Sequence, residues 1–100
     1  MKKKIFISGP MSGIKDNNIH AFNEKERELL SEGHDVMNPA SHGTDETKSW
    51  LDYMIDDLRM LSECTHIHFL DGWEESAGAQ IEALAAKRMG IEIHDPDTLI

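Results

Sequence analysis

The run Lys4-Ile5-Phe6-Ile7-Ser8, followed at once by Gly9-Pro10, decides the fold of this chain. A short apolar segment that stops at a Gly-Pro pair is typical of a buried strand. A polar helix is predicted next, roughly over 17–31, with Gly33 as its stop. The pattern then repeats, with strands predicted at 34–38, 65–70 and 91–94 and helices at about 47–63 and 76–89.

This alternation predicts an α/β fold, a three-layer sandwich with a parallel, flavodoxin- or Rossmann-like sheet of four to five strands. In such sheets ligands bind beyond the carboxyl ends of the strands. The glycine-containing loops 9–13 and 71–78 follow the first and third strands, so we expect them side by side at that edge. One hundred residues suffice for one core, and residues 1–100 are therefore interpreted as a single domain.

Composition excludes several classes of function. Nineteen acidic and ten basic residues give a net charge of -9, which argues against nucleic acid or an anionic membrane as a partner. No apolar run approaches the roughly 20 residues that span a bilayer, and the one after Lys2-Lys3-Lys4 is too short for a signal peptide. We therefore expect a cytoplasmic protein. Cys64 is the only cysteine, which excludes a disulfide framework and a cysteine-based zinc site.

Glu82 is the first candidate for chemistry, because of its neighbours on the predicted helix. The residues three and four positions away are all small: Gly78, Ala79, Ala85 and Ala86. A glutamate that serves solubility normally shares its face with polar residues, whereas this stripe leaves room for a ligand. Ser76 and Gly78 lie just before it, where a helix offers unpaired N–H groups to an anion. The arrangement predicts chemistry on a phosphorylated or sugar-bearing ligand.

Asp57 is the second candidate carboxylate. Its helical neighbours are largely apolar, whereas Asp56 faces Asp52 and Arg59 and is expected in solvent. A carboxylate partly removed from water has a raised pKa and can exchange protons near neutrality. Two carboxylates in different surroundings suit a nucleophile and an acid/base group. The structural alternative is that Asp57 caps a loop or pairs with Arg59 or His42.

The turn Gly9-Pro10-Met11-Ser12-Gly13 lies where a phosphate-binding loop would be, but it lacks both the G-x-G-x-x-G spacing and a Gly-Lys-Ser/Thr ending. Its backbone N–H groups and the Ser12 hydroxyl can still cradle a small anion, and a plain strand-to-helix turn is the alternative. His66 and His68 share one face of a strand, but no acid or cysteine stands at a ligand-like spacing, so we predict no metal and no cofactor. Trp73, beside Glu74 and Glu75, is expected to stack on a base or to cover the pocket, and an exposed loop aromatic is the alternative.

Three segments together resemble the nucleoside 2-deoxyribosyltransferase-like superfamily, which includes the nucleoside 5′-monophosphate N-glycosidases. They are Ile5-Phe6-Ile7-Ser8-Gly9-Pro10-Met11-Ser12-Gly13, the Asp57-Leu58 helix, and Ser76-x-Gly78-Ala79-x-x-Glu82. The resemblance runs from Lys4 to about Ile93 and points to a short branch common in phages and prophages.

The resemblance implies that Glu82 attacks the anomeric carbon of a sugar to form a glycosyl-enzyme intermediate, and that Asp57 assists at the sugar and base. Ser76 matches a position where the transferases carry an acid and the monophosphate hydrolases carry serine, which favours a 5′-nucleotide. The candidate substrate-binding residues are Gly9, Pro10, Met11, Ser12, Gly13, Ser76 and Gly78.

We therefore expect an enzyme that cleaves or transfers the N-glycosidic bond of a (deoxy)nucleoside or its 5′-monophosphate. A nucleotide-binding sensor or accessory protein without turnover is the alternative. A homodimer or higher homo-oligomer is expected, because a sheet of this size leaves apolar residues such as Trp50, Leu51 and Tyr53 uncovered. The shared sites of the family that the chain resembles imply the same.

Overall fold

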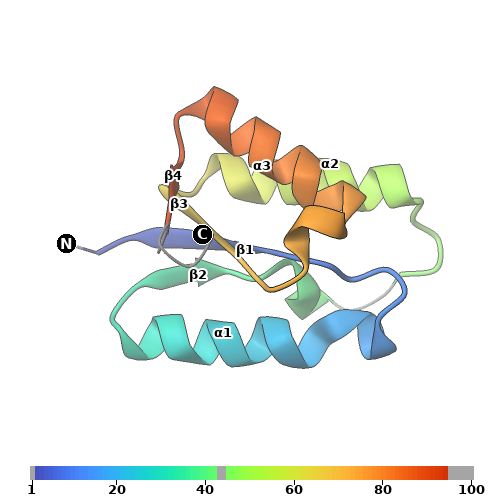
Figure 1. Cartoon of the computed structure of the whole chain (residues 1–100), viewed down its shortest axis with the longest axis horizontal. Helices are drawn as coiled ribbons and strands as arrows, with labels where there is room; N and C mark the ends of the chain where they lie inside the picture. The colour runs from blue at the N-terminus through green and yellow to red at the C-terminus, as the bar shows by residue number, and fades with distance from the viewer. Residues whose placement is uncertain (1, 43–44, 95–100) are drawn as a thin grey trace.

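Four parallel strands form the central sheet of the computed structural model, which describes residues 2–42 and 45–94 (Figure 1). The strands are β1 (Lys4–Ser8), β2 (Asp35–Met37), β3 (His66–Phe69) and β4 (Glu92–Ile93), in the order β2-β1-β3-β4. Helix α1 (Ile19–Ser31) covers one face, and α2 (Trp50–Ser62) and α3 (Ala77–Met89) cover the other. The predicted three-layer α/β sandwich is confirmed.

The predicted elements are present, and local hydrogen bonds explain their exact ends. Helix α2 begins at Trp50 rather than 47 because Ser49 and Asp52 form a capping box, each side chain accepting from the other's backbone N–H. The Ser76 hydroxyl caps α3 in a similar way by accepting from Ala79 N at 3.2 Å. Short 3₁₀ turns occupy parts of the predicted loops and of the first helix: η1 (Lys15–Asn18), η2 (Pro39–His42) and η3 (Trp73–Glu75).

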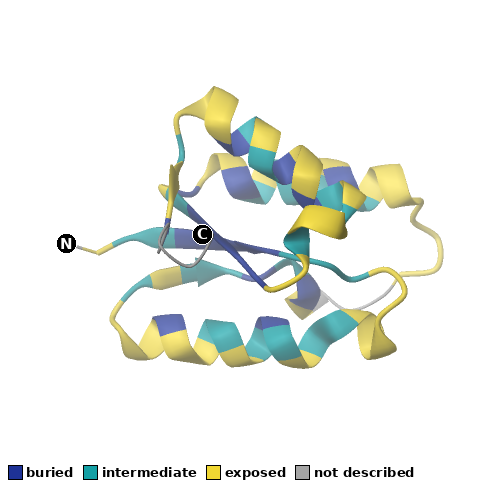
Figure 2. Ribbon diagram, in the orientation of Figure 1, coloured by how far each residue is buried: buried dark blue, intermediate teal, exposed yellow. Residues whose placement is uncertain are grey.

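Side chains of β1 alternate between two cores, one on each face of the sheet. Figure 2 shows most of β1 coloured as buried, between α1 and the layer of α2 and α3. Ile5 and Ile7 pack with Phe22 of α1, whereas Phe6 packs with Leu61 of α2 on the opposite face. Ser8 shares the parity of Phe6, so its hydroxyl points to the α2–α3 side although the residue is fully buried. A buried hydroxyl at the end of a central strand needs a hydrogen-bond partner, and this partner belongs to the candidate site.

The carboxyl ends of the adjacent strands β1 and β3 mark the switch point of the sheet. The connection after β1 leads to β2 at one edge, and the connection after β3 leads to β4 at the other edge. Here the loops run very close together, since a Cβ on Gly9 would lie 2.8 Å from Leu70 Cβ. Leu70 N also donates to Ser8 O at 2.8 Å. The predicted adjacency of the two glycine-containing loops is confirmed, and it explains why residue 9 has no side chain.

Candidate functional site

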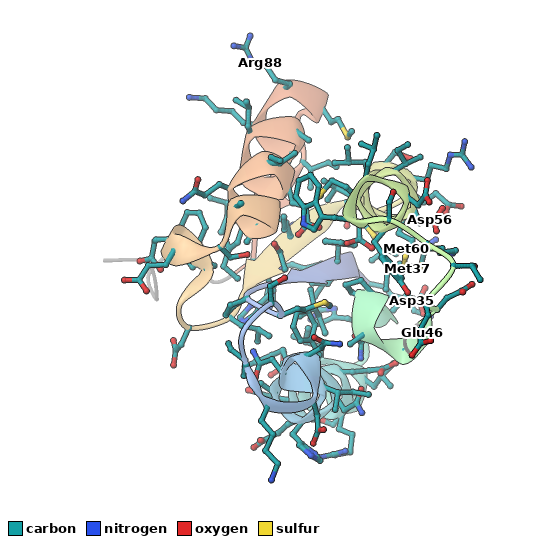
Figure 3. All side chains as sticks on the ribbon, turned by 90° about the vertical axis from the view of Figure 1, so that its right-hand side faces the viewer. Asp35, Met37, Glu46, Asp56, Met60 and Arg88 are labelled. Atoms are coloured by element: carbon teal, nitrogen blue, oxygen red, sulfur yellow. The ribbon has the colours of Figure 1, made fainter. Side chains whose placement is uncertain are left out.

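A cavity of about 710 Å³ lies at this switch point, beyond the carboxyl ends of β1 and β3. Three groups of predicted residues line it: the loop after β1, the start of α3, and one face of α2. Figure 3 views the molecule from this edge. Of the predicted site residues, the cavity brings together Gly9, Pro10, Met11, Ser12, Asp57, Ser76, Gly78 and Glu82.

Glu82 is the most buried charged group of the cavity wall, with 5% of its surface exposed. Ser8 Oγ donates to Glu82 Oε1 at 2.6 Å. Burial raises the pKa of Glu82 to about 8; the Ser8 hydrogen bond opposes this shift, while the charge of Asp57 and a hydrogen bond with it add to the rise. The Glu82–Asp57 pair therefore retains a proton near neutral pH and can pass it between the two carboxyl groups.

Asp57 and Asp56 differ in their surroundings, as predicted. Asp57 is half-buried, lines the cavity and is hydrogen-bonded with Glu82. Asp56 lies on α2 outside the cavity lining and pairs with Lys48 Nζ at 2.8 Å (Figure 3). Adjacent positions on one helix thus separate a carboxyl group that faces the cavity from one that forms a surface ion pair. The side chain of His42, an alternative partner for Asp57, lies outside the described residues.

Two predicted features are only partly present. Gly13 does not line the cavity; it is exposed in a turn at φ +81°, a conformation that favours glycine. Of the four small residues around Glu82, Gly78 and Ala79 line the cavity, whereas Ala85 and Ala86 pack in the core. Of the stripe that was predicted to leave room for a ligand, only the part before Glu82 in the sequence borders the cavity.

A family model described as "Domain of unknown function (DUF4406)" matches residues 3–95. The chain belongs to the DUF4406 family. The matched range covers the whole sheet, the three α-helices and every candidate residue. No curated protein matches the chain.

Ser8 was not predicted as a site residue of this DUF4406 chain. Its hydroxyl donates to one carboxyl oxygen of Glu82, and its position on β1 indicates this contact. It stands two residues after Phe6 on the strand, so its side chain had to point toward the α2–α3 face. The alternation of side chains along β1 predicts this direction, but Ser8 is easily overlooked at the end of an apolar run.

Three consecutive residues of the same DUF4406 chain, Asp16, Asn17 and Asn18, have left-handed backbone conformations with φ of 53°, 54° and 63°. Asp16 and Asn17 line the cavity, and Asn18 Nδ2 donates to Pro10 O at 3.0 Å. This turn ties the loop after β1 to the start of α1. Aspartate and asparagine are the non-glycine residues that best tolerate this conformation, which is the sequence signal that was missed.

Apolar and aromatic side chains complete the wall on the side of α2 and η2. Trp50, Tyr53 and Met54 line the cavity with Pro39 and Ala40. Trp73 does not line the cavity; it is half-buried and stacks on Phe69 with ring centroids 4.2 Å apart, so neither the pocket-covering alternative nor the exposed one describes it. Within 2–42 and 45–94, no group of three or more His, Cys, Asp and Glu side chains is arranged to hold a metal ion. No helix there is both long and apolar enough to cross a membrane.

Proposed function

We propose that this DUF4406 protein cleaves or transfers the N-glycosidic bond of a (deoxy)nucleoside or its 5′-monophosphate, with Glu82 as nucleophile. The observation that carries the proposal is the buried Glu82, held by Ser8 and hydrogen-bonded with Asp57, in the wall of a ligand-sized cavity. Perturbed carboxyl groups gathered in a cleft are typical of catalytic sites. The resemblance of the motifs around both residues to the deoxyribosyltransferase-like superfamily supports the same reading.

The chemistry follows from one shared proton. Glu82 passes its proton to Asp57, and the Glu82 carboxylate attacks C1′ of the sugar as the C1′–N bond breaks. The bonding pair leaves on the base, which takes the proton from Asp57. Water or a second base then attacks C1′ and gives up its proton to Asp57 as the ester bond to Glu82 breaks, which restores both the Glu82 carboxylate and the shared proton. A fixed carboxylate in a dry site also stabilises the positive charge that develops at C1′.

The remaining lining residues suit the parts of such a substrate. The flat faces of Trp50 and Tyr53 beside Met54 offer stacking surface for a base. Ser12, Ser76 and Gly78 offer hydroxyl and backbone groups for the sugar and its 5′ end. The hydrogen bond from Ser8 Oγ to Oε1 helps to hold the Glu82 carboxyl group in the cavity wall, where it would face the sugar.

A sensor that binds a nucleotide without turnover is the second candidate. It is favoured by the pKa of Glu82 near 8, because a carboxyl group protonated at neutral pH is a poor nucleophile until a ligand or Asp57 removes the proton.

Release of free base distinguishes the two candidates. Purified protein is incubated with ribo- and deoxynucleosides of each base and with their 5′-monophosphates, and free base is quantified by chromatography. We expect release from at least one compound by the wild type and none by Glu82→Gln. A ligand that binds in calorimetry yet yields no base would replace the enzyme with the sensor.

We further propose a homodimer that uses the outer face of α2 and α3. On α2, Leu51 is 59% exposed, and Ile55, four positions later, is exposed as well. On α3, Leu84 is 58% exposed, and Ile81, three positions earlier, is exposed as well. Trp50, which is both exposed and part of the cavity wall, would place the partner close to the site. Light scattering at micromolar concentration should give twice the monomer mass, and Leu51→Glu with Leu84→Glu should give the monomer mass.

A further inference from the structure

Every charged side chain that lines the cavity is acidic. Asp16, Asp57, Asp71, Glu75 and Glu82 line it, and none of the ten lysines and arginines does, although all ten lie within the described residues. Several of these cations are engaged elsewhere: Lys48 with Asp56, Lys25 with Glu28, and Lys2 with Asp35. Arg88 extends from the far end of α3, away from the sheet (Figure 3).

This charge distribution disfavours a phosphate group. A 5′-phosphate carries close to two negative charges at neutral pH and is normally held by arginine, lysine or a set of converging N–H groups. The N-terminus of α3 supplies the equivalent of about half a positive charge. Glu75, one residue before the cap Ser76, lies in the same wall and opposes it. The balance in the cavity is negative, and it attracts a cation.

Resting on the proposed function, we infer that the substrate of this cavity is an N-nucleoside without a 5′-phosphate whose base carries a positive charge, such as an N-alkylated purine or a pyridinium nucleoside. The chemistry of bond cleavage fits this class. When the C1′–N bond of a cationic base breaks, the electron pair returns to the ring nitrogen and the base leaves as a neutral molecule. No proton has to be delivered to it, and the proton of Glu82 passes to Asp57 or to solvent.

The buried acid pair adds a coupling between ligand charge and protonation. A cation against Glu82 lowers its pKa and favours the ionised nucleophile, whereas a phosphate raises the pKa further and keeps the carboxyl protonated. Binding of a cationic nucleoside should therefore release protons at pH 7, and binding of a monophosphate should not.

Two matched sets of ligands test the inference by calorimetry at low salt. The first contains 2′-deoxyadenosine, its N1-methyl cation and its 5′-monophosphate; the second contains benzamide riboside, nicotinamide riboside and nicotinamide mononucleotide. We expect the cation to bind at least about tenfold more tightly than its neutral or phosphorylated counterpart in one set or both, with proton release measured in buffers of different ionisation enthalpy. Equal or tighter binding of the uncharged or phosphorylated compounds in both sets, or no binding at all, would overturn it.

Charge variants test the cause of the preference. Asp16→Asn, Asp71→Asn and Glu75→Gln combined neutralise the exposed rim, and Asp35→Asn, Glu46→Gln and Glu63→Gln combined change net charge equally outside the cavity lining. The rim variant should reduce the cation-to-monophosphate affinity ratio about tenfold or more, and the control should keep it. An unchanged ratio in the rim variant overturns the inference; Glu75→Gln alone gives the same test with a smaller effect.

Base release keeps this inference separate from the proposed function. Cleavage of monophosphates in preference to cationic nucleosides would overturn the inference and leave the glycosidase intact. Tight binding of the cation without release of base would support the inference and overturn the glycosidase.

Discussion

Two clusters of polar side chains lie at different parts of the same sheet, and they differ in whether their contacts stabilise the fold. Glu82, Ser8 and Asp57 gather at the carboxyl ends of β1 and β3. Around His94 lie the rings of His34, His66 and His68, with centroids 5.6, 6.5 and 5.6 Å from that of His94. In the first cluster Glu82 and Asp57 line the cavity, and Ser8 is buried behind Glu82; no member of the histidine cluster lines it.

The histidine cluster has a structural explanation. Lys3 N donates to His34 Nδ1 at 3.3 Å, and Lys3 Nζ lies 3.1 Å from His94 Nδ1. These contacts connect the chain before β1 to the segments that flank β2 and β4, so the imidazoles join strands. The acid pair has no comparable structural benefit, since burying a carboxylate beside another destabilises the fold at neutral pH. A buried group that destabilises the fold and lies next to a cavity indicates a functional role, whereas side chains that connect strands indicate a structural role.

The largest effect is expected from Glu82→Gln, which should abolish base release, a loss of at least about a thousandfold, since the amide cannot attack C1′. The same change should stabilise the fold. The folded pKa of Glu82, about 8, lies above its unfolded value of 4.5, so wild-type stability falls as pH rises through that interval. We expect a gain of roughly 1–3 kcal/mol at pH 8 that vanishes near pH 4, measured by urea unfolding.

Glu74→Gln is the matched control, because Glu74 is exposed on the same edge and does not line the cavity. It should change neither base release nor the free energy of unfolding at pH 8. A Glu82→Gln protein that is less stable than wild type at pH 8 would assign Glu82 a structural role.

Asp57→Asn should slow base release by about 10²–10⁴-fold, as expected for loss of an acid/base group. It should also lower the pKa of Glu82, because the charge of Asp57 contributes to the raised value. The acidic limb of the pH–rate profile should therefore move to lower pH. Asp56→Asn, one residue away in a surface ion pair, is the control, and equal effects of the two would contradict the distinction between them.

Gly78→Ala should separate stability from binding. A Cβ at Gly78 would lie 3.7 Å from Met54 Sδ, an ordinary contact, so the gain in helix propensity should stabilise α3 by up to about 1 kcal/mol. The added methyl enters the cavity wall and should weaken nucleoside binding about tenfold. Gly90→Ala, at φ +74° after the same helix, should do the reverse: it should destabilise the fold and leave binding unchanged. Calorimetry and thermal unfolding measure both.

The fold was largely predictable because local patterns determine it. Alternating apolar runs and glycine stops located all four strands, and the switch-point rule located the cavity. Ser8 and the left-handed turn at 16–18 were not predicted, since their roles depend on residues distant in sequence: Ser8 on Glu82, and Asn18 on Pro10. Ala79 illustrates the same limit. The sequence places it on the small stripe that leaves room for a ligand, but it is 1% exposed, so a larger side chain such as that of Ala79→Leu would disrupt the core.

The smallest effect is expected from the histidine cluster. Burial, together with the nearby charge of Lys3, lowers the pKa of His66 below 6.5, while Glu92 opposes the shift. Because the unfolded chain then binds a proton at a higher pH than the folded chain, stability should decline as pH falls below about 6.5. His66→Gln should remove part of this slope, a difference of about 1–3 °C in Tm between pH 7 and pH 5.5, without changing base release at pH 7. His20, exposed on α1 outside the cluster, offers the control His20→Gln, which should leave the Tm at pH 7 unchanged. If His66→Gln altered base release at pH 7 while the slope stayed the same, this cluster too would belong to the functional part of the molecule.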